Sequence, residues 1–190
     1  TDAAERVKIQ YGTSMCYPVS SMGSHVSVVP NHQLNRKTPL HTRANVAYFG
    51  TFGYELDLNK LSDEEIREVK QQITFMKEYR ELIQFGTFYR LKSPFEGNET
   101  AWMTVSEDKK TALVFWYRER NVVNADFTRV RLQGLDPDLI YRNEYNGTEN
   151  YGDELMNLGL LTTDCTAGEP TSEDEPCTDY ESRIYVLTAK

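Results

Sequence analysis

Residues 12–58, GTSMCYPVSSMGSHVSVVPNHQLNRKTPLHTRANVAYFGTFGYELDL, are the stretch of this sequence that decides its fold. Two segments in it are strand-like, MGSHVSVV at 22–29 and YELDL at 54–58. The first is rich in valine, which favours a strand, and Pro30 would end that strand because proline has no N–H to donate. The second alternates apolar and acidic residues, which is typical of a strand with one buried face.

Helical patterns lie between and around these two strands. Residues 39–50 place alanine and leucine at helical spacing behind an N-terminal proline, which predicts a short helix. Residues 3–11 predict another helix that ends at Gly12. From Ser62 the pattern is clearest, because Ser62 and Glu65 form a capping box ahead of an apolar stripe. We interpret that stripe as core; it consists of Ile66, Val69, Ile73, Met76 and Ile83.

The resulting order is helix, strand, helix, strand, helix. Two strands joined by a helix are typical of a parallel βα sheet or barrel, because parallel strands need a crossover connection. Two strands alone do not make a stable parallel sheet. We therefore expect the remaining strands to precede residue 1.

The texture of the sequence changes after Leu91. The run KSPFEGNET at 92–100 reads as a linker, so we expect domains at 1–91 and 92–190. Strand-like runs follow at 101–106, 111–119, 128–135, 139–146 and 182–189. Because no long helix intervenes, an antiparallel β-sandwich is the simplest architecture. The acidic run 163–181 is interpreted as a hairpin extension without a functional site.

Composition excludes several classes of function. The chain has 190 residues, 39% of them hydrophobic, and a formal net charge of −8, which argues for a globular protein and against a nucleic-acid partner. No apolar run is long enough to cross a bilayer, so we expect no membrane association and a cytoplasmic location. The start, TDAAERVKIQYG, is neither a signal peptide nor an initiator start, and we interpret the chain as a piece of a larger protein.

The three cysteines give little chemistry. Cys16 has apolar neighbours, so we expect its thiol to be buried. Cys165 and Cys177 could form a disulfide, but we favour two free thiols. Neither has a His or a further Cys nearby, so they do not predict a zinc site.

A long stretch of the sequence resembles a known family. Residues 11–62, YGTSMCYPVSSMGSHVSVVPNHQLNRKTPLHTRANVAYFGTFGYELDLNKLS, resemble the C-terminal part of the barrel in bacterial α-galactosidases of glycoside hydrolase family 36. The resemblance continues collinearly through EYRELIQFGTFYRL at 78–91. In the second half it rests on YGDELMNLGL at 151–160, which is similar to the family's near-terminal GDELM segment.

This resemblance implies the last βα units of a (β/α)8 TIM barrel followed by a C-terminal antiparallel β-sandwich. It implies an enzyme that removes terminal α-galactosyl groups from melibiose or raffinose with retention of configuration, without a metal or other cofactor, and as a homo-oligomer, expected to be a tetramer. A retaining glycosidase needs a nucleophile and an acid/base carboxyl group. The family's nucleophile lies in a KWD segment that is absent here. Its acid/base lies in a segment similar to WTSDDTDA, whose tail matches Thr1, Asp2 and Ala3. The resemblance thus places both catalytic aspartates before Thr1 and none in this chain.

Barrel sites are built at the C-terminal ends of strands, so four residues here are candidates for substrate binding. They are His25, Ser27, Asn31 and His32. An analogy to the related clan of α-galactosidases, in which the seventh strand lines the galactose pocket, points to His25 or Ser27. The alternative is that His25 is a hydrogen-bonded core imidazole and that the polar loop supports the rim or a neighbouring subunit.

Glu55 and Asp57 face the same side of the second predicted strand. A carboxylate pair can perform acid/base chemistry, but these two residues directly precede a helix cap. We favour an electrostatic or hydrogen-bonding role at the strand end.

Two other functions remain open. The second domain could be a carbohydrate-binding or oligomerisation module with an aromatic stacking platform, although aromatics in a sandwich are more often core; the candidates are Trp102, Trp116, Tyr117, Tyr141 and Tyr145. The parent protein could also be a related α-sugar hydrolase or a transglycosylase. We expect the isolated chain to be inactive on aryl α-galactosides and to fold poorly, because an opened barrel exposes strand edges.

Overall fold

The computed structural model describes residues 1–122, 127–162 and 179–190. The chain divides into two units, Thr1–Gly86 and Thr87–Lys190. The sequence predicted a boundary after residue 91, which is five residues later than the observed boundary after Gly86. Strand β3 (Thr87–Lys92) pairs with β4 (Glu99–Val105), so these residues belong to the sheet of the second unit.

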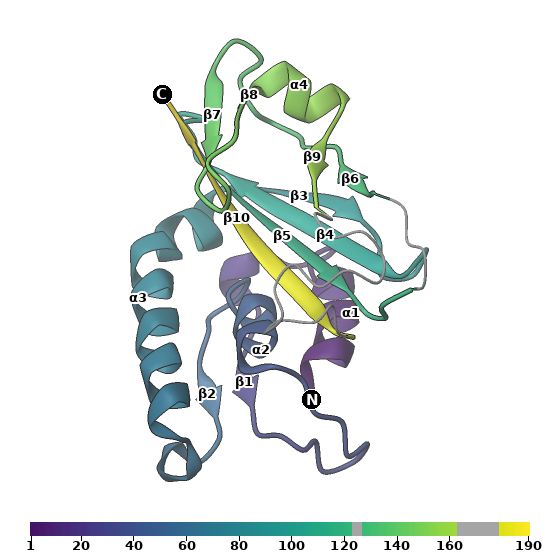
Figure 1. Cartoon of the computed structure of the whole chain (residues 1–190), viewed down its shortest axis with the longest axis vertical. Coiled ribbons are helices and arrows are strands. Elements are labelled where there is room, and N and C mark those ends of the chain that lie inside the picture. Colours follow the sequence, from purple (N-terminus) through teal and green to yellow (C-terminus); the bar gives the residue numbers. More distant parts are fainter. Residues whose placement is uncertain (123–126, 163–178) are drawn as a thin grey trace. The chain divides into compact units, whose positions relative to one another are not determined.

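The first unit alternates helices with two short strands (Figure 1). Its elements are α1 (Ala3–Thr13), η1 (Val19–Ser21), β1 (Val26–Ser27), α2 (Leu40–Ala47), β2 (Tyr54–Glu55), η2 (Leu58–Lys60) and α3 (Asp63–Phe85). Strands β1 and β2 pair in parallel, with Val26 opposite Tyr54 and Ser27 opposite Glu55. The predicted crossover through a helix is therefore confirmed for this pair of strands.

Both strands are much shorter than the predicted segments 22–29 and 54–58. On the N-terminal side of β1, the Ser24 hydroxyl donates to the Ala47 carbonyl at 2.6 Å and accepts from the Phe52 amide at 3.1 Å. The Ser24 side chain thus holds this segment against the end of α2, and the segment does not continue the hydrogen-bonded pairing with β2. On the C-terminal side of β2, Asp57 caps η2 by accepting from the Asn59 amide. The polar loop after β1 buries two of its residues, Asn31 and Thr38.

Local capping explains where the helices of the first unit begin. Asp2 caps α1 by accepting from the Glu5 amide. The predicted capping box of α3 is present, because the Ser62 hydroxyl accepts from the Glu65 amide while the Glu65 carboxylate accepts from the Ser62 amide. The stripe on α3 buries three of its five members, Val69, Met76 and Ile83.

The second unit is built on one antiparallel sheet of six strands (Figure 1). Its elements are β3, β4, β5 (Thr111–Arg118), β6 (Arg129–Val130), β7 (Ile140–Asn143), β8 (Glu149–Tyr151), α4 (Gly152–Asn157), β9 (Leu160–Leu161) and β10 (Glu181–Ala189). The strand order is β3-β4-β5-β10-β7-β8, and every pairing is antiparallel. The predicted antiparallel arrangement is therefore present.

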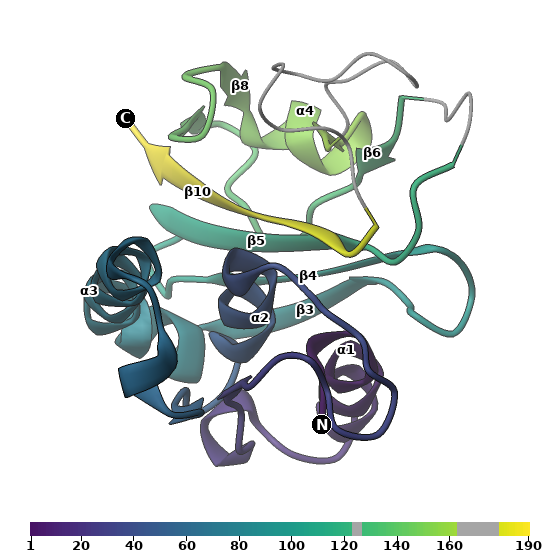
Figure 2. The ribbon, with the colours of Figure 1, turned by 60° about the horizontal axis from the view of Figure 1, so that its bottom comes forward.

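The partner layer of this sheet is smaller than a second full sheet. The antiparallel ribbon of β6 and β9 lies with α4 over one face of the six strands (Figure 2). Leu132, Leu155 and Leu160 from this layer pack in one buried cluster with sheet residues such as Met103 and Leu187. The core of the unit thus lies between the sheet and this ribbon-and-helix layer.

The prediction that the Cys16 thiol is buried is wrong, whereas the preference for aromatic core residues in the second unit holds for Trp116 and Tyr141. Cys16 is exposed, because it lies in the turns after α1, where its amide donates to the Thr13 carbonyl, and its neighbours Met15 and Tyr17 are exposed too. Trp116 and Tyr141 belong to the core cluster and cannot form a stacking platform. Cys165, Cys177 and most of the acidic run lie outside the described residues.

Candidate functional site

The carboxyl ends of β1 and β2 place a group of polar side chains at one edge of the first unit. Ser27 and Glu55 are the last residues of the two parallel strands and lie opposite each other. The Ser27 hydroxyl donates to the carbonyl of Thr1 at 2.7 Å, and the Ser27 carbonyl accepts from Arg43 of α2 at 2.8 Å. The backbone that enters α1 therefore passes this edge, where sites of parallel βα folds are built.

An arginine, a histidine and a glutamate from three elements form a connected row beside this edge. Arg6 of α1 places its Nη2 at 3.1 Å from Nδ1 and 3.0 Å from Nε2 of His25. The Nε2 of His25 also lies 3.0 Å from Oε2 of Glu55. A neutral imidazole with its proton on Nε2 satisfies both neighbours, because Nδ1 then accepts from Arg6 while Nε2 donates to Glu55.

The electrostatics favour that neutral form of His25. Burial lowers the pKa of His25 below its ordinary 6.5, and the positive charge of Arg6 lowers it further. Glu55 opposes these two effects by raising the pKa. Burial also lowers the pKa of Arg6, which still lies far above neutral pH because guanidinium groups remain protonated in proteins. The row therefore holds one cation, one neutral ring and one carboxylate.

A second cation joins the loop after β1 to the start of α1. Arg36 donates from Nη1 to Oδ2 of Asp2 at 2.7 Å, and the same nitrogen lies 3.6 Å from Oε1 of Glu5. The Asp2 side chain is 3% exposed and uses its other oxygen to cap α1. Asp2 is thus an N-cap and half of an ion pair that is largely shielded from water.

Asn31 organises the loop from which Arg36 extends. Its Oδ1 accepts from the amides of Gln33 and Leu34, both at 3.0 Å. Its backbone amide donates to the Arg36 carbonyl at 2.9 Å. The Asn31 side chain is therefore engaged within its own loop, and this loop geometry presents Arg36 to Asp2.

The four candidates from the sequence end in different environments. Ser27 ends β1, His25 directly precedes that strand, Asn31 is buried in its loop, and His32 is exposed on that loop. The contacts of His25 are those of the hydrogen-bonded imidazole that we considered as the alternative. Sequence reasoning missed Arg6 and Arg36 as members of the site.

Glu55 and Asp57 do not form a carboxylate pair. Glu55 binds His25, whereas Asp57 accepts from the amide and side chain of Asn59. The expected electrostatic and hydrogen-bonding roles at the strand end are confirmed.

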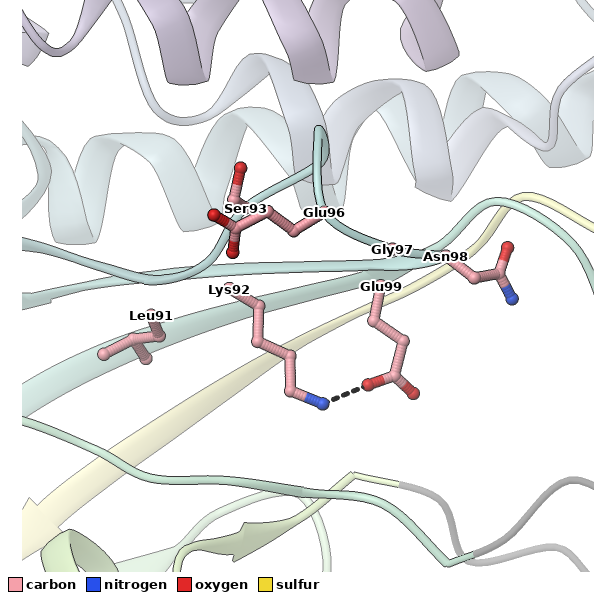
Figure 3. A pocket seen from close by; sticks show the side chains of 7 residues that line it. All are labelled: Leu91, Lys92, Ser93, Glu96, Gly97, Asn98 and Glu99. Atoms are coloured by element: carbon pink, nitrogen blue, oxygen red, sulfur yellow. Dashed lines mark hydrogen bonds and ion pairs between the residues drawn. The ribbon is translucent and has the colours of Figure 1, made fainter.

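The second unit contains a pocket of about 300 Å³ at the hairpin between β3 and β4 (Figure 3). It is lined by Leu91, Lys92, Ser93, Glu96, Gly97, Asn98 and Glu99. Its two central charges neutralise each other, because Lys92 forms an ion pair with Glu99, which also accepts from Thr128. The Asn98 side chain is bound to the backbone of Arg120. The pocket therefore offers few unengaged polar groups to a ligand.

Two features are absent from the residues that the structure describes. Among them, no group of three or more His, Cys, Asp or Glu side chains is arranged to hold a metal ion. No helix in the same residues is long and apolar enough to span a membrane.

Comparison with known families assigns both units. Residues 1–86 match the family model Melibiase, and residues 99–187 match the model for the glycosyl hydrolase family 36 C-terminal domain. The two matches are collinear and cover most of the chain.

Curated relatives agree with these matches. The chain is 55% identical over 160 residues to alpha-galactosidase AgaA of Geobacillus stearothermophilus, which covers 84% of this chain and 22% of that protein. It is 46% identical over 189 residues to alpha-galactosidase 1 of Pediococcus pentosaceus, covering 100% of this chain and 24% of that protein. The chain thus spans about a quarter of the length of these relatives.

Solved structures show the same correspondence. The crystal structure of AgaA from Geobacillus stearothermophilus matches the whole chain with a TM-score of 0.90 and 49% identity, and the chain covers 25% of it. A variant of that enzyme was solved in complex with raffinose and matches with a TM-score of 0.90 and 48% identity, again over 25% of its length. The galactosidase domain of AgaSK matches with a TM-score of 0.89 and 44% identity, with the same coverage.

Proposed function

This chain belongs to glycoside hydrolase family 36, and we propose that it is the C-terminal portion of a retaining α-galactosidase that removes terminal α-galactosyl groups from melibiose and raffinose-type oligosaccharides. The observation that carries the proposal is the match over the whole chain, at 49% identity and a TM-score of 0.90, to an α-galactosidase. A variant of that relative binds raffinose.

In this proposal the first unit forms the last βα units of a (β/α)8 barrel, and the second unit is the antiparallel domain that follows. The two reacting carboxyl groups are aspartates that precede Thr1, separated by roughly 5 to 5.5 Å as retention requires. One attacks the anomeric carbon, while the other protonates the departing oxygen and later deprotonates water. No metal or other cofactor takes part. The parallel pairing of β1 and β2 across α2 supports the barrel assignment, because it is the repeating unit of that fold.

His25 is the residue of this chain that we expect to contact the sugar. Its side chain retains 19% of its exposure, and the residue directly precedes the two-residue strand β1. Both ring nitrogens of His25 have protein partners in this structure, so in this proposal a sugar hydroxyl takes the place of the exposed Glu55 carboxylate at Nε2. Ser27 and Asn31 support this edge, and the exposed His32 faces either the substrate rim or a neighbouring subunit of a cytoplasmic tetramer.

The test is the reaction of the parent enzyme. Purified enzyme should hydrolyse raffinose and an aryl α-galactoside, and proton NMR of the early product should show α-galactose before mutarotation. Early β-galactose would indicate inversion. Cleavage of another α-sugar in preference to the galactoside would favour a related α-sugar hydrolase, and transfer of galactose to an acceptor sugar in preference to water would favour a transglycosylase.

A carbohydrate-binding role for the second unit is the less favoured alternative. Trp116 and Tyr141 are in its core cluster, and Tyr145 packs edge-on against Tyr185 while Arg183 lies over its ring. These rings are engaged by protein neighbours, so we assign the unit a structural role in the parent enzyme.

A further inference from the structure

The start of α1 is held at the carboxyl edge of β1 by two independent contacts. Arg36 binds the Asp2 carboxylate at 2.7 Å, and Ser27 binds the Thr1 carbonyl at 2.7 Å. One contact comes from the loop after β1 and the other from the strand itself. Together they fix both the backbone and the side chain at the point where the chain enters α1.

Asp2 makes a contact that helix capping does not require. A cap needs only a side-chain oxygen that accepts from an amide of the first turn, which Asp2 Oδ1 supplies to Glu5. The second oxygen of Asp2 is used by a guanidinium, and the Asp2 side chain is 3% exposed. A charge-assisted contact shielded from water is directional and strong, so the residue that precedes Asp2 has little freedom to move.

We propose that Arg36 and Ser27 are positioning residues for the acid/base aspartate, holding the segment on which it lies against the end of β1. This inference rests on the proposed function, which places that aspartate a few residues before Thr1. In this proposal neither residue contacts the reacting atoms. Each acts through Asp2 or Thr1, and a displacement of the general acid by about 1 Å can lower the rate by about 100-fold.

The loop after β1 holds Arg36 in place for its contact with Asp2. Asn31 closes the loop through its bonds to Gln33 and Leu34, and its amide binds the Arg36 carbonyl. Lys37, the next residue, is an exposed cation of the same loop. Lys37 therefore provides a matched control for loss of charge without loss of the contact to Asp2.

The experiment compares substrates that differ in their need for a proton. In the full-length enzyme, kcat/KM is measured for raffinose, whose leaving group needs general-acid assistance, and for dinitrophenyl α-galactoside, whose leaving group needs little. The variants are Arg36→Ala, Arg36→Lys and Ser27→Ala, with Lys37→Ala as the control. The ratio of kcat/KM for the two substrates reports the general acid separately from overall folding.

The expected result is selective. Arg36→Ala should lower kcat/KM for raffinose by about 10- to 100-fold and change it far less for the dinitrophenyl substrate. Arg36→Lys should restore part of the loss, since it keeps the charge but not the guanidinium geometry. The high-pH limb of kcat/KM, which reports the general acid of the free enzyme, should move in Arg36→Ala and stay in place in Lys37→Ala.

Equal losses on both substrates with an unmoved pH profile would overturn the positioning role and leave Arg36 as a structural residue. Unchanged kinetics in Arg36→Ala and Ser27→Ala would overturn it as well. If Arg36→Ala does not fold, Ser27→Ala, which removes one hydroxyl, decides the question by the same ratio. A wild-type enzyme with no activity on either galactoside would contradict the proposed function, whereas an active wild type with an unchanged ratio in the variants contradicts only the positioning role.

Discussion

His25 Nε2 lies 3.0 Å from Glu55 Oε2, so the residue that directly precedes β1 is tied to the last residue of β2 beside the candidate site. Because the same ring also contacts Arg6 at 3.1 Å through Nδ1, His25 connects α1, β1 and β2.

The first prediction concerns the protonation of His25. Burial and Arg6 lower its pKa, so the folded protein holds this proton less tightly than the unfolded chain does. The stabilising effect of the neutral ring is therefore present above pH 6.5 and is lost as the pH falls from there through the lowered pKa. An NMR titration of His25 should give a pKa below 6.5. Arg6→Ala should raise that value and Glu55→Gln should lower it; shifts of the opposite sign would contradict the arrangement.

The second prediction concerns the capping box of α3. Ser62→Ala removes the acceptor for the Glu65 amide and should lower the free energy of unfolding by about 1 kcal/mol. Thr74→Ala is the control, because Thr74 is exposed in the middle of the same helix and its hydroxyl bonds only to the Lys70 carbonyl. Denaturant melts followed by circular dichroism should show a loss for Ser62→Ala and almost none for Thr74→Ala. Equal effects would mean that the box does not contribute.

The third prediction concerns the core of the second unit. Leu187 on β10 is 1% exposed and belongs to the buried cluster. Leu187→Ala should therefore cost about 2–5 kcal/mol, the usual range for a buried leucine that leaves a cavity. Leu158, which is 63% exposed, supplies the control Leu158→Ala. Unfolding monitored by tryptophan fluorescence should separate the two variants.

The fourth prediction concerns Gly152, the first residue of α4. A Cβ at this position would lie 1.9 Å from the Asp136 carbonyl oxygen, which is backbone and cannot rotate away. Gly152→Ala should destabilise the unit by about 1–3 kcal/mol through overpacking. Gly97→Ala should be tolerated, because nothing lies within 4 Å of a Cβ added there. A thermal melt of both variants measures the difference, and an unaffected Gly152→Ala would show that the segment shifts easily.

The fifth prediction concerns the isolated 190-residue chain. Because the proposed function places both aspartates before Thr1, the purified chain should not hydrolyse an aryl α-galactoside above the buffer rate. The full-length enzyme measured beside it is the positive control. Measurable turnover by the chain would require that the carboxylates come from this sequence.

Sequence reasoning succeeded where a local signal was strong. The Ser62 and Glu65 box located α3 to within one residue, and the valines with Pro30 located β1. The lengths of β1 and β2 were overestimated because a strand extends only as far as it has a neighbour, and Ser24 and Asp57 bond elsewhere. The helix α4 has six residues, too few for any apolar periodicity.

The site was predictable only in part. His25 and Ser27 follow from their place at the end of a predicted strand, which is a local property. Arg6 and Arg36 lie 19 and 34 positions away from their partners His25 and Asp2, and no spacing rule connects residues over such distances. The one available signal was Asp2 in front of a predicted helix, which predicts a cap but not the cation that binds its second oxygen.

The position of β10 has a consequence for the synthesis of the protein. This nine-residue strand comes last along the described chain, yet it lies inside the sheet, between β5 and β7 (Figure 1). Until residues 181–189 leave the ribosome, β3-β4-β5 and β7-β8 are separate ribbons that share no hydrogen-bonded strand. The second unit can therefore close only after residues 181–189 have been translated, and a nascent chain stopped before residue 181 exposes the unpaired edges of β5 and β7 to chaperones or aggregation.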